Sequence, residues 1–182
     1  NHVTEVMGYF SIGTASGETQ PVEESQPTEE PLISSYAINF QPASADVPTG
    51  YQVDSGETFD ATIGYGWASG PNSLGTRDRN KSASPDQAYD TMIYVDPASI
   101  WEIAVPNGTY SVTICNGDAS YPKGTQNVQA EGITIIDYIK LTSSTKWFEG
   151  TASIPVTDGK LTITFTGSSD PARLCWITIS PN

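Results

Sequence analysis

The chain has 182 residues and carries 21 acidic against 8 basic side chains, which gives a net charge of −13. A protein that binds nucleic acid needs a basic surface to displace counterions from phosphates, so this composition excludes that class and disfavours anionic membrane surfaces. No apolar run approaches the roughly 18 residues of a membrane-spanning helix, and the sequence therefore predicts no insertion into a membrane.

The first 14 residues are expected to form an isolated strand. Its apolar side chains include Val3, Val6, Tyr9, Phe10 and Ile12. Residues 15–35 follow as an acidic linker rich in proline and glutamate, whose low apolar content cannot bury a core. The strand is either the tail of a preceding domain or a donor strand that pairs with the sheet edge of a neighbouring copy.

Residues 36–182 are expected to form one module. Short apolar and polar alternations recur between turn signals, and no window shows sustained helical periodicity. This pattern predicts an all-β fold, namely an antiparallel β-sandwich of the jelly-roll type. The expected strands are 36–40, 63–67, 89–95, 100–105, 109–115, 125–129, 133–142, 151–156, 160–165 and 173–179.

Two alternating runs between Trp101 and Tyr121 flank an Asn107-Gly108 pair. Asn-Gly accepts positive φ at both central positions of a tight turn, which predicts a β-hairpin here. Cys115 lies in the second run and Cys175 in the last expected strand. The two thiols either form one disulfide or remain separate and free, and the sequence leaves both possibilities open.

Several segments resemble the galactose-binding-like and malectin-like β-sandwich modules of large secreted bacterial proteins and polysaccharide-active enzymes. These segments are 38–42, 47–51, 65–67, 76–80, 86–91, 101–120, 131–132, 157–161 and 175–177. The resemblance implies a β-sandwich, an extracellular location on a cell surface or in the medium, and a polysaccharide or glycan as partner. One departure is residues 170–173, where the family is expected to have an asparagine-containing segment.

Sugar-binding sites combine aromatic faces, which stack on the C–H patches of a pyranose, with planar polar groups that bind hydroxyls. Trp67 lies beside two glycines and a polar loop, so its ring is predicted to face that loop, the alternative being a place in the core. Arg77 is expected either to clamp an acidic sugar or to hold Asp86 or Asp90 within its own loop. The candidate ligand-binding residues are Tyr65, Trp67, Arg77, Asp78 and Trp147.

Calcium is the metal that suits so many carboxylate and amide oxygens. The candidate ligands are Asp54, Asp60 and Asp118, although no EF-hand spacing connects them. Zinc is disfavoured, because the chain has one histidine, His2, and two distant cysteines.

Catalytic signatures are scarce. The chain has no Gly-x-Ser-x-Gly motif, and its one histidine lies in the N-terminal segment, so a Ser-His-Asp triad is not expected. Carboxylates are plentiful, but most lie in turns or in the linker, where a solvated charge is the ordinary explanation. We therefore predict a non-catalytic carbohydrate-binding module. The alternative is a structural subunit of an extracellular filament or tube, assembled from copies of itself through residues 1–14 with the possible help of Ca²⁺.

Overall fold

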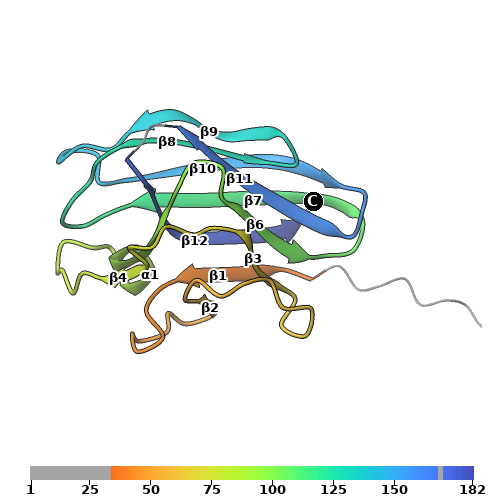
Figure 1. The fold of residues 1–182 in the computed structure, drawn as a ribbon, viewed down its shortest axis with the longest axis horizontal. Coiled ribbons are helices and arrows are strands. Elements are labelled where there is room, and N and C mark those ends of the chain that lie inside the picture. The colour runs from red at the N-terminus through yellow and green to blue at the C-terminus, as the bar shows by residue number, and fades with distance from the viewer. Residues whose placement is uncertain (1–33, 168–169) are drawn as a thin grey trace, which may run out of the picture. The chain divides into compact units, whose positions relative to one another are not determined.

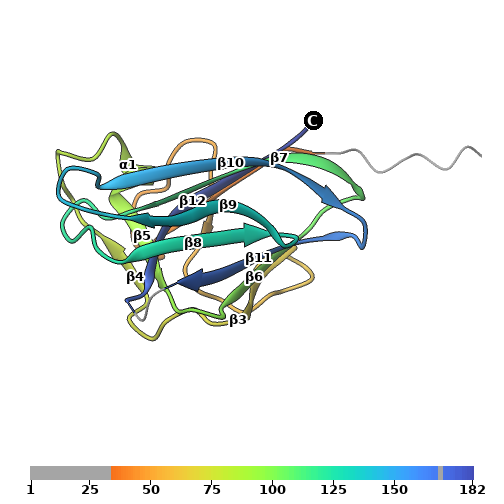
Figure 2. The ribbon, with the colours of Figure 1, turned by 90° about the horizontal axis from the view of Figure 1, so that it is seen from above.

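The protein folds into two β-sheets that lie face to face, as Figures 1 and 2 show. The structure is a computed structural model that describes residues 34–167 and 170–182. The predicted all-β sandwich is confirmed. The predicted donor strand 1–14, with Val3, Val6, Tyr9, Phe10 and Ile12, lies outside the described residues, as does nearly all of the linker 15–35.

The larger sheet has seven strands, five of them in the order β10-β7-β12-β1-β2, while β5 pairs with β12 and β4 pairs with β5. These strands are β1 (Tyr36–Phe40), β2 (Gln52–Asp54), β4 (Thr76–Asp78), β5 (Thr91–Val95), β7 (Gly108–Gly117), β10 (Trp147–Val156) and β12 (Ala172–Pro181). β1 and β2 are parallel, and all the other pairs of named strands are antiparallel.

The smaller sheet has five strands in the order β3-β6-β11-β8-β9. They are β3 (Tyr65–Ser69), β6 (Ile100–Ala104), β8 (Thr125–Ala130), β9 (Ile133–Lys140) and β11 (Lys160–Gly167). Strand β11 shows the alternation that drives the fold: Leu161, Ile163 and Phe165 are buried between the sheets, whereas the residues between them are half-buried.

The predicted strands correspond to observed ones, with one correction at 89–95. Residues Gln87–Asp90 form a single helical turn, α1, and only Thr91–Val95 are extended. The Asp86 carboxylate starts this turn by accepting hydrogen bonds from the amides of Ala88 and Tyr89. No described helix is long and apolar enough to cross a membrane. The three-residue strands β2 and β4 were not predicted, because so short a segment shows no alternation.

The predicted hairpin around Asn107-Gly108 is wrong. β6 lies in the smaller sheet and β7 in the larger one, so the turn joins the two layers instead of two paired strands. Neither Asn107 nor Gly108 has the positive φ that a tight hairpin turn needs. The Asn107 side chain instead accepts a hydrogen bond from the Gly159 amide, 2.8 Å away, which ties this corner to the β10–β11 turn.

The core between the sheets contains the two largest fully buried rings among the described residues, those of Trp67 and Trp101. Phe40 meets both edge-on, with centroids 6.0 and 5.8 Å away. A second apolar cluster holds Cys115 and Cys175 as buried free thiols. Of the two alternatives for the cysteines, one disulfide or two free thiols, the structure shows two free thiols. The two thiols nevertheless lie in the same apolar cluster.

Candidate functional site

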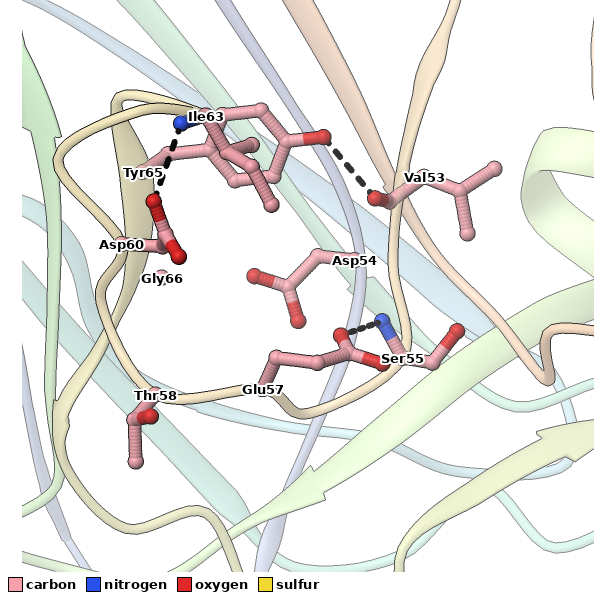
Figure 3. Close-up of a pocket in the computed structure, with 9 residues that line it drawn as sticks. All are labelled: Val53, Asp54, Ser55, Glu57, Thr58, Asp60, Ile63, Tyr65 and Gly66. Atoms are coloured by element: carbon pink, nitrogen blue, oxygen red, sulfur yellow. Dashed lines mark hydrogen bonds between the residues drawn. The ribbon is translucent and has the colours of Figure 1, made fainter.

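A pocket of about 420 Å³ opens between the end of β2, the loop that follows it, and the start of β3. Figure 3 shows the side chains that surround it. The residues that line it are Val53, Asp54, Ser55, Glu57, Thr58, Asp60, Ile63, Tyr65 and Gly66. The volume falls within the range of pockets that bind small molecules, roughly 300–1,000 Å³.

The loop 55–64 is held in place by backbone and carboxylate hydrogen bonds. The Gly56 amide donates to Asp54 Oδ1 at 2.8 Å, and the φ of +105° at Gly56 is one that glycine adopts without strain. Further along, the Trp67 amide donates to the Glu57 carbonyl at 3.0 Å, and the Phe59 amide donates to the Trp67 carbonyl at 3.1 Å. The loop thereby pairs with β3, and this pairing positions the loop along the pocket.

Asp54 lies at the inner end of the pocket and is 1% exposed. Its Oδ1 accepts a hydrogen bond from Trp67 Nε1 at 3.0 Å, and its Oδ2 accepts one from Trp101 Nε1 at 2.8 Å. Burial raises the pKa of Asp54 to about 6, although the donated hydrogen bonds favour the ionised form and oppose this rise. The carboxylate therefore joins the pocket to the two indoles of the core.

Glu57 and Asp60 bring two exposed carboxylates to the outer part of the pocket. The Asp60 carboxylate accepts hydrogen bonds from the amides of Thr62 at 2.6 Å and Ile63 at 3.3 Å. These bonds lower the pKa of Asp60, so this group is ionised at neutral pH. The Ser55 amide donates to Glu57 at 2.9 Å and fixes the other carboxylate.

Tyr65 contributes the aromatic ring of the pocket. Its hydroxyl donates to the Val53 carbonyl at 2.9 Å, which bridges β3 to β2, and burial raises the pKa of this phenol. Ile63 adds an apolar side chain that is 59% exposed. An aromatic ring, an exposed aliphatic group and fixed carboxylates form a surface that can contact the C–H patches of a sugar and accept hydrogen bonds from its hydroxyls.

The structure brings together three of the residues singled out from the sequence, because Tyr65, Asp54 and Asp60 all line this pocket. Trp67 is close by, but the prediction that its ring faces the loop is wrong. Its side chain is 1% exposed and lies against Phe40 and Phe165 in the core. The alternative reading, a core tryptophan, describes it, and its indole N–H positions Asp54 from behind.

Arg77 and Asp78 lie in β4, away from this pocket. Arg77 Nη1 donates to the carbonyls of Leu74 and Thr76 at 2.7 and 2.6 Å, and its guanidinium lies 5.4 Å from the Tyr94 ring centre. Arg77 therefore anchors its own loop, as one of the two predicted roles required. Its partners are backbone carbonyls, however, and not the predicted carboxylates of Asp86 or Asp90. Asp78 accepts from the Asn80 amide at 3.1 Å, which also belongs to the loop.

Trp147 belongs to a different aromatic group. Its ring meets Tyr89 edge-on at 6.1 Å, and Tyr89 in turn meets Trp176 at 5.6 Å. The Trp147 indole donates to the Tyr89 carbonyl at 2.9 Å. A ligand role for Trp147 would therefore require a site separate from the pocket beside Tyr65.

Asp118 is also separate from the pocket and is paired with Arg79, whose Nη2 lies 2.6 Å from its Oδ2. Burial alone would raise the pKa of Asp118, but the hydrogen bonds from Arg79 and from the Tyr121 and Ser120 amides outweigh it and hold this pKa below its ordinary value. The described residues contain no group of three or more His, Cys, Asp or Glu side chains placed to hold a metal ion. Calcium binding therefore stays a prediction from the sequence.

Sequence reasoning missed the apolar and hydroxyl members of the pocket: Val53, Ser55, Thr58 and Ile63. Val53 lies in β2, a strand too short to be recognised, and Ser55 and Thr58 follow it in the loop, whereas Ile63 lies at the other end of the loop, just before β3. The signal that could have found them is the Asp54-Ser55-Gly56-Glu57 segment, since Asp and Gly two residues apart favour a turn closed by the Asp side chain.

Comparisons with known proteins place the chain among β-sandwiches. No protein-family model matches it. Over 101 residues, 56% of this chain, it is 31% identical to β-agarase A of Zobellia galactanivorans, and the match spans 18% of that protein. The chain thus corresponds to a small part of this relative.

Solved structures agree on the architecture. Protein YxiM of Bacillus subtilis superposes with a TM-score of 0.60 at 21% identity, over 82% of this chain and 40% of that one. The solved structures that this chain resembles are malectin-like β-sandwich domains. The plant receptor-like kinase FER gives a TM-score of 0.60 at 14% identity, covering 82% and 42% of the two chains. The β-glucuronidase of Bacteroides uniformis gives 0.56 at 12%, covering 82% and 18%. The resemblance inferred from the sequence is confirmed for the fold.

Proposed function

We propose that this protein is a non-catalytic carbohydrate-binding module that acts outside the cell and holds a glycan in the pocket beside Tyr65. The observation that carries the proposal is the composition of this pocket, where one aromatic ring and an exposed isoleucine face carboxylates fixed by the loop. The similarity to a segment of β-agarase A supports a glycan as the ligand and makes agarose oligosaccharides the first probe. The malectin-like fold supports an extracellular setting, since the same fold occurs in a plant receptor ectodomain.

One observation favours a second function, that of a glycoside hydrolase. The pKa of Asp54 is raised and that of Asp60 is lowered within one pocket, and such a division is what an acid and a base of a hydrolase need. The burial of Asp54 argues against it, because a carboxyl that is 1% exposed and accepts from two core indoles has no access to a glycosidic oxygen. Incubation with agarose oligosaccharides should therefore release no new reducing ends, and release that Asp54→Asn abolishes would establish the hydrolase.

Replacing Tyr65 by alanine is expected to weaken binding of agarose oligosaccharides about tenfold or more, since it removes the only aromatic ring among the described residues of the pocket. Isothermal titration calorimetry would measure the change. Tyr65→Phe loses only the hydrogen bond to the Val53 carbonyl and should bind within about twofold of the parent.

The matched control is Tyr138→Ala, which removes a tyrosine that is 62% exposed on β9. Its binding should equal that of the parent protein. Circular dichroism must show that each variant is folded. If Tyr65→Ala and Tyr138→Ala bind alike, the pocket is not the glycan site.

A further inference from the structure

The pocket has a one-sided charge. Among the described residues that line it are three carboxylates and no lysine or arginine. The three are Asp54, Glu57 and Asp60, of which two are exposed at the outer part of the pocket. The molecule as a whole also carries a negative net charge, −13.

The cation that approaches the pocket loop is already neutralised. The Lys160 ammonium lies 5.4 Å from the ring centre of Phe59, which sits between two pocket residues in the chain. Lys160 Nζ is also 2.6 Å from Glu102 Oε2, so its charge is paired outside the pocket. A ligand in the pocket therefore meets acceptors that carry negative charge and no free cation among its lining groups.

The hydrogen bonds in the loop keep this charge in place at neutral pH. The amides of Thr62 and Ile63 lower the pKa of Asp60 and hold it ionised. The Ser55 amide donates to Glu57 Oε2 at 2.9 Å and fixes the position of that carboxylate in the pocket. Such carboxylates accept hydrogen bonds from sugar hydroxyls, but they have no proton to donate to a sulfate ester or to a uronate.

We propose that this pocket selects neutral sugars and rejects glycans that carry sulfate esters or uronic acids. The inference rests on the proposed glycan-binding function and adds the class of glycan. An anionic group in the pocket would lose water without gaining a cationic partner among the described lining residues, and it would also be repelled by two fixed carboxylates. Neutral hydroxyls incur neither cost.

The test compares a neutral agarose oligosaccharide with the same oligosaccharide after chemical sulfation, and with an oligouronate of equal length. Titrations at pH 7.5 and low salt, with a chelator present, should show binding of the neutral sugar and at least tenfold weaker binding of both anionic ones. The Debye length falls from about 30 Å at 0.01 M salt to about 10 Å at 0.1 M, so added salt screens the repulsion between the carboxylates and an anionic sugar. The difference in affinity between neutral and anionic sugars should therefore become smaller at higher salt.

The double variant Glu57→Gln/Asp60→Asn keeps side-chain oxygens but removes two negative charges. Its affinities for the neutral and the sulfated oligosaccharide should therefore lie closer together than those of the parent protein. The matched control is Asp137→Asn, which removes an exposed charge on β9 and should leave the ratio of the two binding affinities unchanged. Equal or tighter binding of the sulfated probe would overturn the selectivity and leave the glycan-binding function intact. No binding of any probe would overturn both. A double variant that discriminates as strongly as the parent would show that the pocket carboxylates are not the cause.

Discussion

Replacing Asp54 by alanine is expected to lower the free energy of unfolding by about 3 kcal/mol at neutral pH. The substitution leaves the indole N–H groups of Trp67 and Trp101 without their acceptor in the core. An unsatisfied buried donor costs about 1–3 kcal/mol, and removal of a desolvated charge offsets part of the loss from two of them. Urea denaturation followed by tryptophan fluorescence would measure the change.

Two variants sharpen this prediction. Asp54→Asn keeps one acceptor oxygen and should lose less stability than Asp54→Ala. Glu57→Gln removes an exposed carboxylate from the same pocket and should change stability by less than about 0.5 kcal/mol. Equal effects at Asp54 and Glu57 would contradict a structural role for the hydrogen bonds to the indoles.

The contribution of Asp54 to stability should also depend on pH in a defined direction. Burial raises the pKa of Asp54 from 3.8 to about 6 in the folded protein, so the folded state keeps a proton that the unfolded chain has released between these values. The favourable contribution is full below about pH 4 and is lost as the pH rises to about 6, by about 3 kcal/mol for a shift of roughly two pKa units. The difference in stability between the parent and Asp54→Asn should fall over this range. A difference that grows with pH would contradict the raised pKa.

Some strands are predictable from the sequence because one of their faces is buried and the other is not. In β11 the alternation of Leu161, Ile163 and Phe165 with polar residues fixes both the strand and its register. Strand β2 has only three residues, which range from exposed to buried and show no alternation. It is recognisable as a strand only through its pairing with β1, a segment that is not adjacent to it in the sequence. Local pattern carries no information about such pairs.

The Asn107-Gly108 segment shows the same limit from the other side. Its local preference is for a tight hairpin, but Val112 and Ile114 are buried in the larger sheet, whereas Trp101 and Ile103 are buried in the smaller one. Burying both runs on opposite sides of the core outweighs the preference of a two-residue turn. The sequence could identify a turn at this position but not the layer that each flanking strand would join.

The residue types of the candidate site could be predicted from the sequence, but the direction in which each side chain points could not. Tyr65, Asp54 and Asp60 were selected by residue type, and the structure places them in one pocket. What the sequence could not provide was the direction of Trp67, because its neighbours Gly66 and Ala68 allow either face of β3 to be buried. The buried acceptor at Asp54, 13 residues earlier in the chain, accepts its indole N–H at the inner end of the pocket.

Gly66→Ala is expected to destabilise the fold by about 3 kcal/mol or more and to abolish glycan binding at the pocket. A Cβ at Gly66 would lie 2.7 Å from the backbone Cα and N of Phe59, and 2.8 Å from the carbonyl carbon of Thr58. These atoms belong to the loop that pairs with β3, so they cannot move without opening that pairing. Overpacking of this kind costs about 1–3 kcal/mol, and the φ of +145° adds backbone strain.

The matched control is Gly64→Ala, two residues earlier at the end of the loop that precedes β3. Gly64 has a φ of +90° and nothing within 4 Å of an added Cβ, so alanine there incurs the backbone strain without the collision. We expect a loss of about 1 kcal/mol and retained binding. If Gly64→Ala and Gly66→Ala lose equal stability in urea denaturation, backbone strain alone governs both sites. A larger loss at Gly66, together with lost binding, would show that the close approach of the loop to β3 is what shapes the pocket.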